Sequence, residues 1–137
     1  MARIRIAITA LLFFVILPSA AGAEVTLETL LVRRWYDNLN IRVSLHNPSP
    51  ARQPGPVVVE LSARANSAEA WIPVKTWNNI NYIQPGFRVS RDFFEENSAF
   101  LRQLASRGTF EVRAVVRAPG QTEAIEKIST YNSESGE

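Results

Sequence analysis

The chain has 137 residues, no cysteine and one histidine, with 15 Lys and Arg residues against 13 Asp and Glu residues. Without Arg3 and Arg5, which lie in the first ten residues, 13 basic residues balance 13 acidic ones. This balance excludes the basic stripe with which nucleic-acid binders neutralise phosphates. The absence of cysteine excludes disulfides, a thiol nucleophile and thiolate metal ligands.

Residues 1–23 have the composition of a cleavable secretory signal. Two arginines give the basic start, residues 6–17 form a nearly unbroken apolar run, and residues 21–23 are the small residues of a cleavage site. The apolar run covers 12 residues, fewer than the roughly 20 that a membrane-spanning helix needs. We therefore predict an exported protein, periplasmic or secreted, whose mature chain starts at Glu24 and does not insert into a membrane after signal cleavage.

The mature chain alternates apolar and polar residues with a period close to two, which is typical of strands with one face in water. Residues 38–46 alternate most clearly, and residues 57–64 alternate again before a predicted turn over 65–70. Between these strands, residues 47–56 contain four prolines and one glycine, which we expect to prevent regular structure. The apolar residues predicted to face the core are Leu39, Ile41, Val43, Leu45, Val57, Val59, Leu61 and Ala63.

Residues 70–83 form a further strand whose two faces admit two assignments. In the first, the even-numbered apolar residues face the core: Ile72, Val74, Ile80 and Tyr82. Trp71 and Trp77 then project outward together, with Lys75 between them. In the second, Pro73 introduces a bulge that exchanges the faces and buries a tryptophan between the sheets. Because proline has no N–H for a central ladder, Pro73 also predicts that this strand lies at a sheet edge.

Residues 98–107 have the spacing of one short helix. Asn97 or Ser98 can cap its start, and Gly108 stands where a left-handed C-terminal residue is favoured. We expect the apolar stripe of this helix to cover one end of the core, with Arg102 and Arg107 in water. The apolar residues at helical spacing are Phe94, Phe100, Leu101 and Leu104. Two later strands are predicted, over residues 109–118 and, with weaker alternation, over residues 122–131.

About seven short strands and one helix predict an all-β fold, a single antiparallel β-sandwich of immunoglobulin or fibronectin type III kind. This domain covers residues 24–131, and the polar, acidic residues 132–137 are predicted to form a disordered tail.

Three segments resemble the CARDB domain, an immunoglobulin-like module of exported bacterial and archaeal proteins. Residues 41–49 resemble its early strand and asparagine-containing turn, residues 82–86 its mid-domain Pro-Gly corner, and residues 108–116 its late strand. The resemblance spans most of residues 25–131 and implies an immunoglobulin-like fold. It implies less about function, because sandwiches host unrelated activities.

Few residues are suited to catalysis. A Ser-His-Asp site would depend entirely on His46, which lies on a polar face at a strand end and is expected to be a surface residue. Glu95 and Glu96 are adjacent, so their side chains diverge, and we interpret them as charges near a helix start. Asp37 and Asp92 are the only aspartates and form no cluster for calcium. We therefore predict no enzyme, no metal and no cofactor.

Exposed aromatic residues indicate binding. Trp71, Trp77 and Lys75 form a predicted ridge, and Trp35 and Tyr36 form a second cluster beside two arginines. The favoured hypothesis is a non-catalytic adaptor that docks on an unidentified envelope or extracellular protein through an edge strand, with these aromatics as anchors.

The alternative hypothesis is a small carbohydrate-binding domain. Trp71 and Trp77 would then stack on the sugar rings of a polysaccharide, and Asn79 and Asn81 would hydrogen-bond its hydroxyls. The asparagine-rich run around Asn79 is equally typical of a polar turn between strands.

Overall fold

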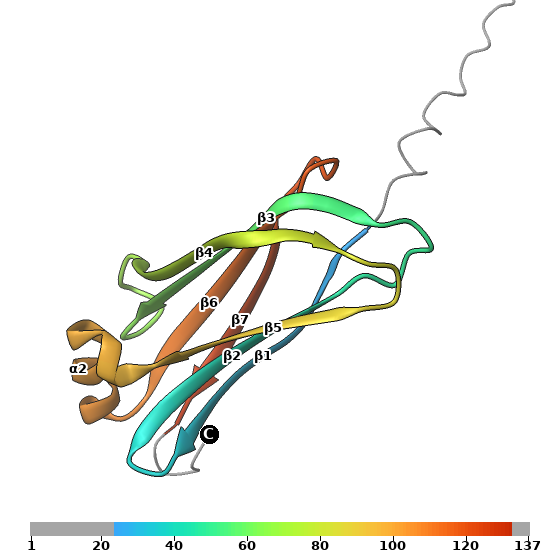
Figure 1. The fold of residues 1–137 in the computed structure, drawn as a ribbon. Helices are drawn as coiled ribbons and strands as arrows, with labels where there is room; N and C mark the ends of the chain where they lie inside the picture. The colour runs from blue at the N-terminus through green and yellow to red at the C-terminus, as the bar shows by residue number, and fades with distance from the viewer. Residues whose placement is uncertain (1–23, 133–137) are drawn as a thin grey trace, which may run out of the picture.

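The computed structural model describes residues 24–132, so the predicted signal over 1–23 and nearly all of the predicted tail lie outside it. In this part of the chain, seven strands form two antiparallel sheets that pack as two layers (Figure 1), which confirms the predicted sandwich. The strands are β1 (Thr26–Trp35), β2 (Asn38–His46), β3 (Gln53–Arg64), β4 (Ile72–Ile83), β5 (Arg88–Phe94), β6 (Phe110–Arg117) and β7 (Ile125–Tyr131). A 3-10 turn, η2 (Glu95–Asn97), precedes the helix α2 (Ala99–Arg107).

The strand order defines the kind of sandwich. One sheet has the order β1-β2-β5 and the other has the order β4-β3-β6-β7. In a constant-type immunoglobulin domain the fourth strand joins the sheet of the first, second and fifth strands. Here β4 pairs with β3 instead, so the arrangement is of the fibronectin type III kind.

The core lies between the two sheets, as the alternation predicts. Leu39 and Ile41 on β2 are fully buried, and so are Val57 and Val59 on β3. β6 presents the same alternation, with Phe110 fully buried at its start. Burial of these apolar side chains is the main term that stabilises a chain without disulfides.

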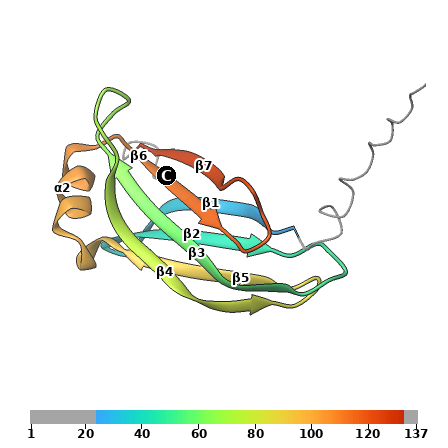
Figure 2. The same cartoon turned by 90° about the horizontal axis from the view of Figure 1, so that it is seen from above.

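Helix α2 begins and ends as its sequence predicts. The Ser98 hydroxyl accepts a hydrogen bond from the Leu101 amide at 3.1 Å, and Gly108 follows the last turn with a φ of 111°. Leu101 and Leu104 are buried against the end of the core. Figure 2 shows the helix at one end of the two layers.

The expectation of no regular structure over residues 47–56 is wrong for its second half, because β3 begins at Gln53. The prolines fit there because the pairing of β3 with β4 is irregular between Pro54 and Val57. Gly55 is required at this place, since a side chain on it would collide with the backbone carbonyl of Asn81 in β4.

Asn47 joins the loop after β2 to the turn between β4 and β5. It is fully buried, and its backbone accepts a hydrogen bond from the Gly86 amide at 2.7 Å and donates one to the Phe87 carbonyl at 3.0 Å. Its side chain hydrogen-bonds the backbone groups of Ser49, Ala51 and Ile83. Residues 41–49 and 82–86, which are far apart in the sequence, are therefore held together by one residue.

The sheet edges at β4 and β5 carry features that hinder pairing with another strand. β4 is an edge strand, as Pro73 predicts, and its pairing with β3 has several irregularities. On the edge strand β5, Arg91 lies on the same face as the buried Phe93 and donates to the Asn79 side chain of β4 at 3.3 Å. Proline, bulges and inward-facing charges are the devices by which edge strands avoid unwanted pairing.

Candidate functional site

The structure does not form the predicted ridge of Trp71 and Trp77. Trp77 is only 8% exposed and packs in the core, whereas Ile72 and Tyr82, expected in the core, are 43% and 49% exposed. The reason is the irregular register between β3 and β4, which breaks the period of two. The first assignment is therefore wrong for Ile72, Tyr82 and Trp77, but Ile80 is 2% exposed, as that assignment predicts. The second assignment is right that an irregular pairing accompanies a buried tryptophan, although the two faces are not fully exchanged.

Trp71 is half-buried and already has partners. The Arg64 guanidinium lies 3.9 Å from the centre of its ring, and the Arg113 guanidinium lies 4.9 Å from it. These cation–π contacts occupy the ring that a sugar would need for stacking. Lys75 and Asn81 are exposed on β4, but Trp77 is not beside them on the surface.

The aromatic residues that do reach the surface together lie at the β1–β2 turn. Trp35 ends β1 and is 45% exposed, and Tyr36 follows it in a two-residue turn and is 86% exposed. Their rings meet edge to face with centroids 5.6 Å apart, and the Arg33 guanidinium lies 4.6 Å from the Trp35 ring centre. We call Arg33, Trp35 and Tyr36 the aromatic turn.

The backbone of the aromatic turn is strained at Tyr36, whose φ is 58°. Two-residue hairpin turns place glycine, asparagine or aspartate where φ is positive, because a larger side chain clashes with the backbone there. A bulky residue in this region costs on the order of 1–3 kcal/mol. The sequence therefore keeps a tyrosine at a position where glycine would be more stable.

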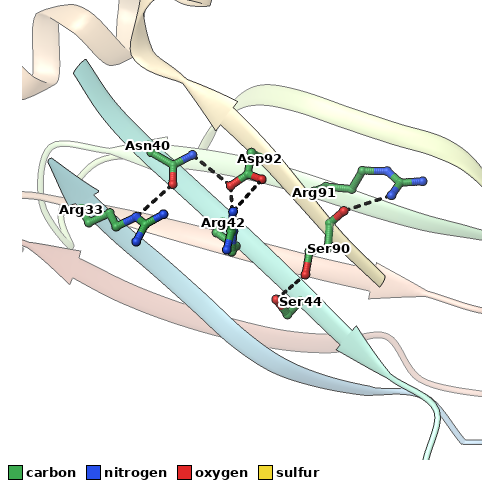
Figure 3. A network of polar contacts seen from close by, with 7 residues as sticks. All are labelled: Arg33, Asn40, Arg42, Ser44, Ser90, Arg91 and Asp92. Carbon is green, nitrogen blue, oxygen red and sulfur yellow. Dashed lines mark hydrogen bonds and ion pairs between the residues drawn. The ribbon is translucent and has the colours of Figure 1, made fainter. Parts of the chain in front are cut away.

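A polar network fixes Arg33 behind the aromatic turn (Figure 3). Arg33 donates to the Asn40 side chain at 3.2 Å, and the Asn40 amide donates to Asp92 at 3.0 Å. Arg42 forms two hydrogen bonds to the same carboxylate, at 2.9 Å and 3.2 Å. Burial alone would raise the pKa of Asp92, but the hydrogen bonds from Arg42 and Asn40 and the nearby positive charges lower it. One carboxylate thus binds Arg42 directly and is linked to Arg33 through Asn40.

The turn η2 supports the aromatic turn from the other side. Glu95 and Glu96 form its first turn, as expected for charges near a helix start, but their carboxylates bind β2. The Glu95 carboxylate is 8% exposed and accepts a hydrogen bond from the Leu39 amide at 2.7 Å. Glu96 accepts one from the Asn38 side chain at 2.8 Å. The start of β2 is therefore fixed just after the strained Tyr36.

His46 is half-buried at the end of β2. Its Nδ1 atom lies 3.9 Å from a carboxylate oxygen of Glu28, which also binds Arg88. Within residues 24–132, no group of three or more His, Asp or Glu side chains is placed to hold a metal ion. No helix of this part of the chain is long and apolar enough to cross a membrane.

The sequence alone indicates Trp35 and Tyr36 but not the residues that support them. Asn40 and Asp92 are 52 positions apart, and only the pairing of β2 with β5 brings them together. The basic residues beside Trp35 were the one local signal for this site, and Arg33 is the one that stacks on its ring.

No protein-family model matches the chain, and no curated protein matches it in sequence. Several solved structures are similar in fold. The β-glucosidase EmGH1 from Erythrobacter marinus is 16% identical with a TM-score of 0.45, over 79% of this chain and 15% of that one. This chain therefore spans a small part of the length of that enzyme.

Two smaller proteins are also similar. The archaellum periplasmic stator protein FlaG from Sulfolobus acidocaldarius is 13% identical with a TM-score of 0.47, over 78% of this chain and 99% of that one. The protein AT1g01470 from Arabidopsis thaliana is 13% identical with a TM-score of 0.40, over 81% and 78% of the two chains. These likenesses carry no functional argument, and the class of this protein, a small β-sandwich, follows from its own strand order.

Proposed function

We propose that the protein is a non-catalytic, CARDB-like interaction module of the cell envelope or extracellular space, which binds a partner protein through its aromatic turn. The observation that carries the proposal is Tyr36, a bulky residue at positive φ whose ring is 86% exposed. Strained backbone is found preferentially at functional sites, because the fold must hold it in place. Apart from its edge contact with Trp35, the Tyr36 ring is exposed, which supports a role for it in binding another molecule.

The neighbours of Tyr36 suit a protein contact. Trp, Tyr and Arg are the residue types that contribute most binding energy at protein interfaces. Arg33 is held by Asn40 and by stacking on Trp35, so less side-chain entropy is lost when a partner binds.

In this proposal the partner binds the aromatic turn and not an edge strand. Pro73 and the irregular pairing of β4, together with the inward-facing Arg91 of β5, hinder strand addition on that side of the sandwich. On the other side, β1 and β7 lie together, with Lys127 donating to the Glu28 carbonyl at 3.4 Å and Arg34 donating to the Tyr131 hydroxyl at 3.3 Å. A partner therefore meets side chains of a turn rather than an open backbone edge.

The experiment that tests the proposal is capture of the partner from crosslinked cells of the native host, with an affinity tag placed directly before Glu24. We expect one envelope or extracellular protein to be enriched, and Tyr36→Gly to lose it. Since glycine relieves the strain at positive φ, this variant is expected to be at least as stable as the wild type, so the loss would not reflect unfolding.

The matched control is Phe87→Ala, which removes an exposed aromatic ring from a different turn, between β4 and β5. Capture that survives Tyr36→Gly, or that is lost equally in the control, contradicts the proposed site.

The carbohydrate alternative now rests on Trp35 and Tyr36 as stacking surfaces. A saturable change in tryptophan fluorescence on titration with peptidoglycan or a neutral polysaccharide, without protein capture, would favour that alternative.

A further inference from the structure

We propose that the recess between α2 and the β3–β4 loop binds a peptide segment of the partner in which an aliphatic side chain lies next to a carboxylate. This inference rests on the proposed function and adds a second contact, with its own chemistry, to the aromatic turn. The recess has a volume of about 210 Å³. That is smaller than the roughly 300–1,000 Å³ typical of sites for drug-sized ligands, so it suits a side chain better than a cofactor.

The walls of the recess are fixed before any partner arrives. Leu104 of α2 is buried against the core and forms part of the floor. On the opposite wall, the Asn66 side chain accepts a hydrogen bond from the Ala68 amide at 2.9 Å, which shapes the β3–β4 loop. Arg64 donates to the Glu111 carboxylate at 2.7 Å and lies over the Trp71 ring. A site formed in advance loses little entropy on binding.

Apolar surface is left uncovered inside the recess. Ile72, at the start of β4, is 43% exposed although it is a large aliphatic residue. Phe100 of α2 is only partly buried and lines the same recess. An aliphatic side chain that entered would cover both, and each buried CH₂ group contributes about 0.8 kcal/mol.

The charged residues at the rim favour a particular group next to that aliphatic side chain in the bound peptide. The charged residues that line the recess are Arg64, Glu69 and Arg107. The charge of Arg64 is matched by Glu111, whereas Arg107 has no carboxylate partner within the described residues. Arg107 lies in the last turn of α2, where a positive charge offsets the helix dipole, and its guanidinium donors remain free for a ligand. A carboxylate is the group that a guanidinium binds with two parallel hydrogen bonds.

Helix α2 and the β3–β4 loop, which form the recess, lie at the same end of the sandwich as the β1–β2 turn (Figure 1). The turn η2 connects them, because it contacts both β2 and α2. One partner can therefore use both surfaces, and linking two weak contacts raises the total affinity without enlarging either.

Selection of a random heptapeptide phage library on the immobilised protein tests the inference. We expect enriched peptides to share an aliphatic residue beside Asp or Glu. By fluorescence anisotropy, Arg107→Gln and Ile72→Ser should each weaken the selected peptide about tenfold, which corresponds to one charge-assisted hydrogen bond or a small apolar contact. Arg102→Gln is the matched control, since it removes the same charge from the same helix at a residue that does not line the recess.

Enrichment of basic peptides, no enrichment at all, or equal affinity for Arg107→Gln would overturn the inference. Sodium decanoate is a second probe, and its binding can be followed by chemical-shift changes at Phe100 and Leu104. If these shifts change but no peptide is selected, the recess binds a small amphiphile, and the inference is also overturned. Tyr36→Gly should leave peptide binding intact. Loss of partner capture therefore reports on the aromatic turn, and loss of peptide selection reports on the recess.

Discussion

Asn47 is the residue on which the junction between the β2–β3 loop and the β4–β5 turn depends. Its fully buried side chain makes hydrogen bonds that an alanine cannot replace, and each buried backbone group left without a partner costs about 1–3 kcal/mol. We expect Asn47→Ala to lower the free energy of unfolding by about 2–4 kcal/mol. Urea denaturation followed by tryptophan fluorescence measures this change.

Asn66 provides the comparison for Asn47. Its side chain accepts a similar local hydrogen bond, from the Ala68 amide at 2.9 Å, but it lies on the surface, where water can replace the contact. Asn66→Ala is therefore expected to cost less than about 1 kcal/mol. Equal losses for the two variants would show that the junction at Asn47 does not hold the loops together.

Protonation of the Asp92 carboxylate makes the free energy of unfolding depend on pH. Because its pKa is lower in the folded protein than the ordinary value of 3.8, its contribution to stability is fully present above that value. The contribution is lost as the pH falls through the folded value, where the carboxylate is protonated and its hydrogen bonds to Arg42 weaken. We expect Asp92→Asn to be less stable than the wild type at pH 7 and to approach it at the lowest pH.

Urea midpoints measured from pH 7 down to the acid limit test this behaviour. The site is partly exposed, so salt should reduce the difference between Asp92→Asn and the wild type. A difference that stays constant at every pH would mean that the carboxylate charge is not what stabilises the network.

In the edge strand β5, the charge of Arg91 is expected to hinder self-association of the sandwich. Arg91 occupies a face that otherwise carries apolar residues, and it reaches across to Asn79 of β4. We expect Arg91→Val to fold but to self-associate, because the variant presents an apolar edge to other copies. Sedimentation velocity measures the association, and Arg102→Val, which removes the same charge from helix α2 and not from the edge strand, should remain monomeric. Two monomeric variants would show that β5 needs no such protection.

The strands differ in how well their sequences predict them. β2, β3 and β6 have neighbours on both sides and alternate regularly, so the pattern gives both the strand and its buried face. The edge strand β4 has a neighbour on one side, its register slips at several points, and its faces could not be assigned from periodicity. For the same reason Trp77 was expected at a surface that it does not reach. Helix α2 was predictable because its signals, the Ser98 cap and Gly108, are local.

For the whole molecule, composition and alternation predict the two-layer sandwich, whereas the binding surface depends on contacts between distant segments. Tyr36 and Trp35 could be named from the sequence as aromatic residues. The positive φ of Tyr36 could not, because nothing in its local sequence is typical of that conformation. The network of Asn40 and Asp92 and the recess beside Arg107 arise only when strands and helix are assembled.

The hydrogen bond between Arg34 and Tyr131 places the end of β7 beside the aromatic turn. β1 runs its full ten residues between Thr26 and that end, about 33 Å at the usual rise of a strand. A fluorophore attached at Asn132 would therefore lie near an incoming partner, whereas one attached at Glu24 would lie far from it. The fold thus offers a pair of positions for an energy-transfer sensor, in which the label at Asn132 responds to binding and the label at Glu24 serves as the internal reference.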